Sequence, residues 1–156
     1  MANPTAQEQE FLELINRMRT APVAELNLLL NASDPSTKAS IDLALKDFGT
    51  NLVTLRSQWD KLNPADPLAW SSELNQAAAG HNQAMIDTNV QAHTIIGEKE
   101  LVERLAAAGY DLTKGGSAAE NIYAYMESIL EGEASLAIDW GKDKLTTPEE
   151  IGRAHV

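Results

Sequence analysis

Apolar residues recur every three or four positions along most of this chain, which is the spacing of helices that bury one face. The spacing predicts helices over about 6–19, 26–30, 41–48, 52–62, 72–88, 98–108 and 134–140. Only the segment 121–126 alternates and is rich in β-forming residues, so it is the one predicted strand. A lone strand constrains the fold strongly, because its backbone N–H and C=O groups need partners in a second strand.

No other part of the chain supplies that second strand. The sequence therefore predicts an α+β protein that is mainly helical here and lacks most of its sheet. Helical faces meant to cover a sheet would then stay in water, at a cost of about 25 cal/mol for each Å² of apolar surface. We expect the chain, purified as given, to be molten, aggregated or oligomeric.

Composition excludes several classes of function. The 156 residues fit one domain, and 44% of them are hydrophobic, as in globular proteins. Twelve basic residues face 23 acidic ones, and the net charge of −11 argues against nucleic acid as a partner. No apolar run is long enough for a transmembrane segment. The absence of cysteine excludes disulfides and thiol chemistry.

The N-terminal residues Met1–Pro4 have neither the basic nor the apolar region of a secretory signal. This is compatible with a cytoplasmic protein, with a leaderless secreted protein, or with a domain of a longer chain.

Residues in the predicted turns indicate where helices begin and end. Thr5 and Glu8 have the spacing of a capping box. Ser36 is placed to cap the helix that follows it. Gly49 and Gly109 suit the C-terminal ends of helices.

Few residues could carry chemistry. His81 lies on the apolar face of the predicted helix 72–88, which favours a core histidine that hydrogen-bonds to the backbone. His93 follows that helix in a loop, where a polar ring can face a cleft. Glu120 precedes the predicted strand, so its carboxylate has to be solvated, paired or metal-bound. Taken alone, Glu120 is best interpreted as a solvated surface charge.

Other acidic residues fit surface positions. Glu98, Glu100 and Glu103 fit a solvated helix face, and Glu100 and Arg104 have the spacing of an i,i+4 ion pair. The usual phosphate-loop, dinucleotide, zinc-protease, nucleophile-elbow and EF-hand motifs are absent. The residues alone therefore indicate a mainly helical domain with a candidate His/Glu pair.

Several short motifs, taken in order, resemble the CAP superfamily of cysteine-rich secretory, antigen 5 and pathogenesis-related proteins. The matching segments are Asn16–Arg19, Pro67–Trp70 with the helix that follows, Ala92–Thr94, Glu103–Tyr110, Ala119–Ile122 and Ile138–Gly141. They resemble the family's Asn-x-x-Arg, Pro-Leu-x-Trp, Ser-His-Ser/Thr, Arg-x-x-x-Ala-Gly-Tyr and Gly-Glu-Asn-Ile elements, and the last segment resembles a bacterial variant. Each motif is short, but their order over 6–141 identifies the chain as a bacterial member.

The resemblance implies an α/β/α sandwich with a cleft lined by two histidines and two acidic residues. His93 matches the first histidine and Glu120 the first glutamate. Asp143 stands loosely where the second acid is expected, and the second histidine belongs to a Gly-His-Arg element that this chain does not contain. The other matched residues are expected to be structural: Asn16, Arg19, Trp70, His81, Arg104, Tyr110, Asn121 and Trp140.

The chain departs from the family pattern at two places. Residues 23–63 form a predicted helical insertion, and Ala119 stands where glycine is usual. Residues 151–156 are what a common sequencing adapter would encode, so we interpret them as a non-native tail. On this interpretation 1–150 is a C-terminally truncated CAP domain.

By resemblance we expect an extracellular binding or interaction module, either leaderless or part of a longer secreted protein. Its cleft would hold a divalent metal, with zinc the first choice, and take a small molecule, a lipid or a peptide. The alternative is a hydrolase with His93 as base and Glu120 orienting it or holding a metal. A binding role is favoured because no activated nucleophile is visible. A cytosolic helical domain without a site is the third interpretation.

Overall fold

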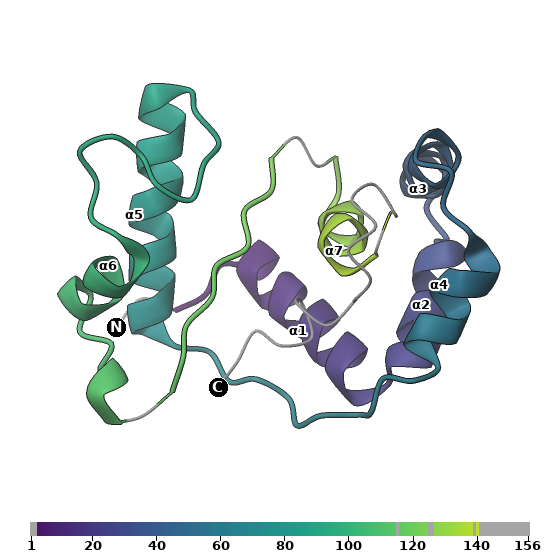
Figure 1. Ribbon diagram of the computed structural model, residues 1–156, viewed down its shortest axis with the longest axis horizontal. Coiled ribbons are helices and arrows are strands. Elements are labelled where there is room, and N and C mark those ends of the chain that lie inside the picture. The colour runs from purple at the N-terminus through teal and green to yellow at the C-terminus, as the bar shows by residue number, and fades with distance from the viewer. Residues whose placement is uncertain (1–2, 115, 125–126, 139, 141–156) are drawn as a thin grey trace. The chain divides into compact units, whose positions relative to one another are not determined.

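The computed structural model describes residues 3–114, 116–124, 127–138 and 140. These residues form two compact units (Figure 1). We call 5–68 with 127–138 and 140 the bundle unit, and 69–124 the site unit. Throughout the described residues the regular structure is helical, which confirms the prediction of a mainly helical chain. None of the described helices is long and apolar enough to cross a membrane.

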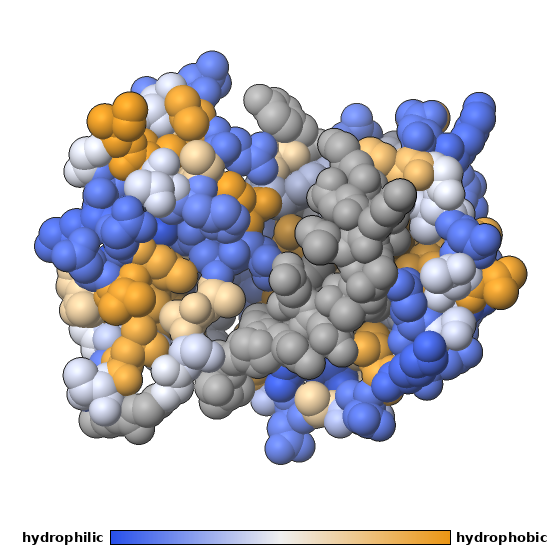
Figure 2. Space-filling model, in the orientation of Figure 1, coloured by the Kyte–Doolittle hydropathy of each residue, from blue (hydrophilic) through white to orange (hydrophobic). Residues whose placement is uncertain are grey.

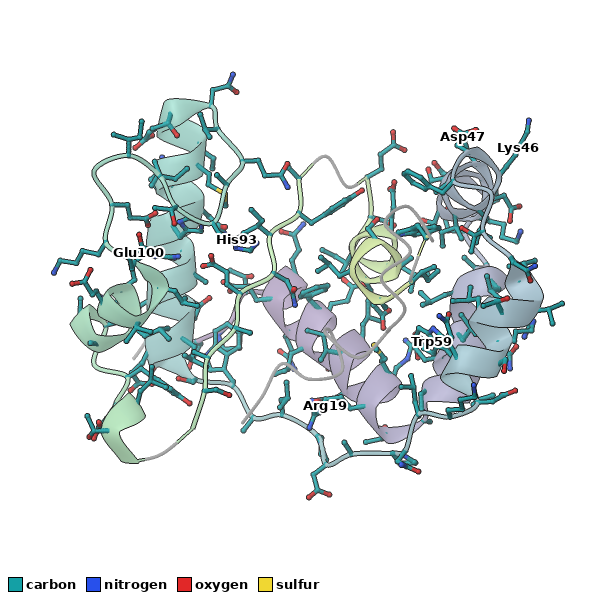
Figure 3. The ribbon with its side chains drawn as sticks, in the orientation of Figure 1. Arg19, Lys46, Asp47, Trp59, His93 and Glu100 are labelled. Atoms are coloured by element: carbon teal, nitrogen blue, oxygen red, sulfur yellow. The ribbon has the colours of Figure 1, made fainter. Side chains whose placement is uncertain are left out.

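The bundle unit consists of helices packed on a shared apolar core. Its helices are α1 (Ala6–Thr20), α2 (Pro22–Leu30), α3 (Pro35–Asp47), α4 (Leu52–Trp59) and α7 (Ile129–Ala137). The core includes Leu29, Leu55 and Trp59, all at most 1% exposed, and Figure 3 labels Trp59 among the side chains of this unit. The segment 23–63 is thus helical, as predicted, and it supplies much of the core.

Most helix ends in the bundle unit follow from the sequence. The capping box at Thr5 and Glu8 is present, and Pro22 occupies the first turn of α2. The prediction of Ser36 as a cap was wrong: the carboxylate of Asp34 accepts the hydrogen bond from the backbone N–H of Thr37. Pro35 then fits the first helical position, where no N–H is needed, so the turn begins two residues earlier than expected.

Helix α7 also begins earlier than the predicted segment 134–140. Ser128 caps it by accepting a hydrogen bond from the backbone N–H of Glu131. The Ser128 hydroxyl also lies 2.9 Å from that of Thr37 on α3. Ala134 and Ala137 are buried, so small side chains let α7 pack closely on α1 and α3.

The site unit is built on α5 (Ser72–Thr88) and α6 (Leu101–Ala107), with a short 3₁₀ turn η1 (Leu112–Lys114). Ser71 caps α5, and both ends of this helix agree with the prediction. Asn89, with φ of 51°, ends α5 in the left-handed conformation. Gly109 has φ of 91° beyond α6, where a residue with a Cβ would be strained, so it confirms the predicted C-terminal glycine.

The strand predicted at 121–126 was wrong for the residues that the structure describes. Residues 121–124 have no regular secondary structure, and 125–126 lie outside the described residues. The described residues offer no neighbouring strand, so the backbone of 121–124 has no ladder to join. β-forming side chains alone do not make a strand, because its hydrogen bonds come from elsewhere in the chain.

Candidate functional site

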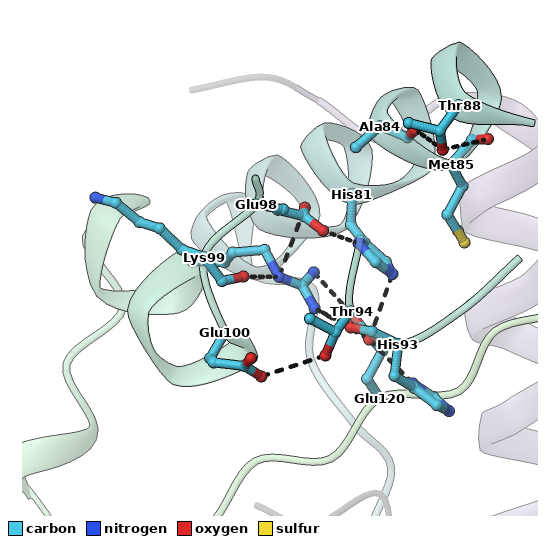
Figure 4. A network of polar contacts seen from close by, with 11 residues as sticks. His81, Ala84, Met85, Thr88, His93, Thr94, Glu98, Lys99, Glu100 and Glu120 are labelled. Carbon is cyan, nitrogen blue, oxygen red and sulfur yellow. Dashed lines mark hydrogen bonds and ion pairs between the residues drawn. The ribbon is translucent and has the colours of Figure 1, made fainter. Parts of the chain in front are cut away.

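The structure brings His93 and Glu120 together within the site unit (Figure 4). His93 lies in the loop that leaves α5 after Asn89, and Glu120 lies in the segment after η1. The Nδ1 atom of His93 is 3.1 Å from Oε1 of Glu120. The His93 side chain is 61% exposed, whereas that of Glu120 is only 14% exposed. A half-buried carboxylate therefore holds an exposed imidazole.

Arg104, on α6, anchors that carboxylate from the inside. Its Nη1 donates to Oε2 of Glu120 at 2.9 Å and its Nη2 to Oε1 at 3.1 Å, which is a two-point guanidinium–carboxylate pair. The same side chain donates to the backbone carbonyls of Lys99 and His93. The hydrogen bond to Glu120 raises the pKa of Arg104, against the opposing effect of burial. Arg104 thus ties α6, the His93 loop and Glu120 together.

This environment keeps Glu120 ionised. Burial alone would raise the pKa of the Glu120 carboxyl, but hydrogen bonds from Arg104 and His93 outweigh it. The charge of Arg104 adds to their effect, and the pKa of Glu120 ends below its usual value of 4.5. An ionised carboxylate only accepts hydrogen bonds, so Nδ1 of His93 carries the proton of their contact, and in the neutral ring Nε2 carries none.

His81 belongs to the same cluster, which corrects its expected role as a core histidine bonded to the backbone. It is 1% exposed, as expected for a core position on α5. Its Nδ1 lies 2.6 Å from Oε2 of Glu98, a carboxylate rather than a backbone group. Its Nε2 lies 3.6 Å from Oε1 of Glu120 and makes no hydrogen bond with the described residues.

Glu98 differs from its expected surface role, and Arg104 differs from its expected pairing. Glu98 precedes α6, and its side chain is 14% exposed rather than solvated. Arg104 pairs with Glu120, and more distantly with Glu98 at 3.7 Å, in place of the expected ion pair with Glu100. Glu100 instead accepts a hydrogen bond from the hydroxyl of Thr94.

Two further residues expected to be structural fix the loop that leads to α5. The side-chain amide of Asn16 donates to the carbonyl of Leu68 at 3.0 Å and accepts from its N–H at 2.6 Å. Arg19 donates to the carbonyl of Asp66 at 2.8 Å, and Figure 3 labels it beside this loop. Both residues therefore hold the proline-containing segment 64–68 against α1.

The remaining expected residues have less specific surroundings. Trp140 donates from Nε1 to the carbonyl of Ser135 at 3.3 Å, and Trp70 is half-buried. The backbone N–H of Tyr110 donates to Leu105, and Asn121 is exposed. Asp143 and the segment 151–156 lie outside the described residues.

An open groove of about 570 Å³ runs beside this cluster, between α5 and α6. His81, Glu98 and Arg104 form part of its lining, together with small residues such as Ala77, Gly80 and Ala84. His93 and Glu120 are not among its lining residues. Figure 2 shows hydrophilic and hydrophobic residues interspersed over the visible face.

The described residues do not fit a metal centre by themselves. They contain no group of three or more histidine, aspartate or glutamate side chains placed to hold one ion. Arg104 already binds both oxygens of Glu120, and its positive charge opposes a cation at that carboxylate. What the arrangement offers is one oriented imidazole, whose Nε2 can accept a hydrogen bond, ligate a metal or take a proton.

Sequence comparison assigns the chain to a family. The family model described as CAP, the cysteine-rich secretory protein family, matches residues 12–138, which include His93, Glu120 and the whole buried cluster. No curated protein and no solved structure matches the chain. The match extends over well more than half of the sequence and agrees with the order of motifs described above. The chain therefore belongs to the CAP, cysteine-rich secretory protein, family.

Proposed function

We propose that this CAP domain is an extracellular binding or interaction module whose contact group is the imidazole of His93. One observation carries the proposal: an exposed imidazole is fixed by a carboxylate that is itself held at two points by a buried guanidinium. Such a shell orders the contact group before the ligand arrives, which reduces the entropic cost of binding. Family membership supports an extracellular location, with the cytoplasm as the alternative.

The ligand has to suit an outward Nε2 lone pair. Hydrogen-bond donors of a small molecule, a lipid headgroup or a peptide would fit it, as would a divalent cation such as Zn²⁺. If a metal binds, Glu120 is the partner that orients the ligating histidine, because Arg104 occupies the carboxylate oxygens. Other ligands to the metal would then come from outside the described residues or from the partner molecule.

Zinc titration tests this proposal directly. We expect calorimetry to show weak Zn²⁺ binding, because the described residues supply one oriented imidazole ligand, and we expect His93→Ala to abolish it. His155→Ala is the matched control, since it removes another histidine of the same chain, and binding should persist. Unchanged Zn²⁺ affinity in His93→Ala would contradict the proposed site at His93. So would a parent chain that binds neither Zn²⁺ nor any member of a peptide or lipid panel.

A hydrolase is the second candidate, because the 3.1 Å contact between His93 and Glu120 is also the geometry of an oriented general base. The hydroxyl next to His93, that of Thr94, donates to Glu100, so it is not held by this base. A binding role is therefore better supported. Turnover of an ester or peptide panel that Glu120→Gln abolishes would establish the enzyme instead.

A further inference from the structure

Three nitrogen donors or acceptors converge on one oxygen of Glu120. Its Oε1 lies 3.1 Å from Nη2 of Arg104, 3.1 Å from Nδ1 of His93 and 3.6 Å from Nε2 of His81. A carboxylate oxygen offers two lone pairs. Arg104 permanently uses one of them, because the guanidinium always donates. The two histidines are therefore alternatives for the second lone pair.

The contact between His81 and Glu98 decides between these alternatives. An ionised Glu98 only accepts hydrogen bonds, so its 2.6 Å contact with His81 requires the proton on Nδ1. In a neutral imidazole the other nitrogen then carries no proton. A bare Nε2 cannot donate to Oε1 of Glu120, which lies 3.6 Å away, and this agrees with the absence of a hydrogen bond from Nε2 to the described residues.

We propose that Glu98 and His81 are positioning residues of the His93 site, and that Glu98 keeps the second lone pair of Glu120 Oε1 available to His93. By fixing the proton of His81 on Nδ1, Glu98 removes the competing donor. Glu120 then accepts from Nδ1 of His93, and His93 presents a bare Nε2 outward. The inference rests on the proposed function only in taking His93 as the contact group.

The alternative arrangement reverses what the site offers to a ligand. Without Glu98, the proton of His81 moves to Nε2, where it can donate to Glu120. His93 then loses its hydrogen-bond acceptor and becomes a mixture of both tautomers. The Nε2–H tautomer is the major one, as in free histidine. The exposed nitrogen changes from an acceptor into a donor. Glu98, which does not contact His93, thus determines the class of ligand group that the site accepts.

Nitrogen-15 correlation spectra of the histidine rings test this, recorded where both imidazoles are neutral. In the parent chain we expect the proton on Nδ1 in both His81 and His93. Glu98→Leu removes the acceptor, so His81 should shift to the Nε2–H form and His93 should lose its fixed tautomer. Glu98→Gln keeps an acceptor oxygen and should preserve the parent pattern. Glu103→Leu, which removes an exposed carboxylate of α6, is the matched control.

A parent spectrum with the proton of His81 on Nε2 overturns the inference, whether or not any variant folds. So does a Glu98→Leu spectrum in which His81 shifts while His93 keeps its tautomer. Zinc titration of the same variants separates the inference from the proposed function. We expect Glu98→Leu to weaken Zn²⁺ binding by about tenfold. If the tautomers change as expected but no variant binds Zn²⁺, the result contradicts Zn²⁺ as the ligand of His93 and supports the positioning role of Glu98 and His81.

Discussion

At the scale of single residues, the charge balance of the site unit depends on Arg104. This side chain is 7% exposed, and its guanidinium lies 2.9 Å from Glu120 and 3.7 Å from Glu98. A carboxylate that loses its only close guanidinium partner in a buried setting is left with an uncompensated charge. The cost of that loss exceeds the net gain from forming the pair.

Replacing Arg104 by leucine should therefore destabilise the fold by about 3 kcal/mol, as measured by urea denaturation at neutral pH. Arg104→Lys should recover only part of this, because an ammonium cannot make the two-point contact with Glu120. Arg56→Leu is the control, since this arginine is exposed and its Nη1 donates to the side chain of Asn27. Equal stability of the Arg104 and Arg56 variants would contradict the anchoring role.

A second buried carboxyl, Glu133 on α7, makes the bundle unit sensitive to pH. It is 2% exposed, and its oxygens have no hydrogen-bond partner in the described residues. Nearby Glu25 is 1% exposed and is paired with Arg17 at 2.6 Å. Burial, and then the charge of Glu25, raise the pKa of Glu133 from 4.5 to about 8. The folded state therefore holds a proton here that the unfolded chain releases.

The stability of the protein should fall as pH rises from about 4.5 to about 8, the interval between the unfolded and folded pKa values of Glu133. Its contribution is fully present below 4.5 and is lost above 8, with a slope of at most about 1.4 kcal/mol per pH unit. Glu133→Gln should flatten the profile of unfolding free energy against pH. The control Glu10→Gln changes an exposed carboxylate and should keep the parent slope of unfolding free energy against pH. If Glu133→Gln also keeps that slope, Glu133 is not the cause of the pH dependence.

At the scale of elements, helix ends with a local signal were predictable. The hydroxyl of Thr5 and the carboxylate of Glu8 satisfy backbone donors within the same turn, so their spacing in the sequence is sufficient. Ser71 likewise caps α5 from one residue before the helix. At α3 only Ser36 was predicted as the cap, and Asp34 was missed; Pro35 fits the first helical position and so leaves the cap to Asp34.

The capping box offers a test at this scale. Thr5→Ala should lower the unfolding free energy by about 1 kcal/mol, because the N–H of Glu8 loses its acceptor. Thr5→Ser keeps the hydroxyl and should be close to neutral. Chemical denaturation of the two variants checks this, and an alanine variant as stable as the serine variant would show that water replaces the cap.

Elements whose partners are distant in sequence were not predictable from local pattern. The side chains at 121–124 favour a strand, yet a strand is decided by a neighbour that the described residues do not contain. The positions of His93 and Glu120 in the sequence indicated a candidate pair, but only the family resemblance placed both of them in one cleft. Glu98 was missed because its partner His81 lies 17 positions away, and neither α5 periodicity nor the turn before α6 indicates that they meet.

At the scale of the whole molecule, the excess of acidic residues opposes compaction. The net charge is −11, and like charges brought together on folding repel one another over a Debye length. The buried pair of Arg104 and Glu120 is screened less than the exposed carboxylates. Added salt should therefore relieve more repulsion than it removes attraction.

We expect the urea midpoint to rise between about 0.01 M and about 1 M sodium chloride, a range over which the Debye length falls from about 30 Å to about 3 Å. Sodium chloride is preferred to sulfate, which strengthens apolar burial by itself. A midpoint that falls with salt would mean that surface ion pairs, such as Lys38 with Asp42, dominate over the net charge.

The burial of Trp59 has a practical consequence, because an indole shielded from water fluoresces at shorter wavelength than a wet one. Trp59 is 0% exposed in the bundle unit, while half-buried Trp70 belongs to the site unit. A Trp70→Phe variant would confine the tryptophan emission to the bundle unit, where Trp140 is the other tryptophan. Its red shift during denaturation would then time the opening of that helical core independently of the histidine cluster.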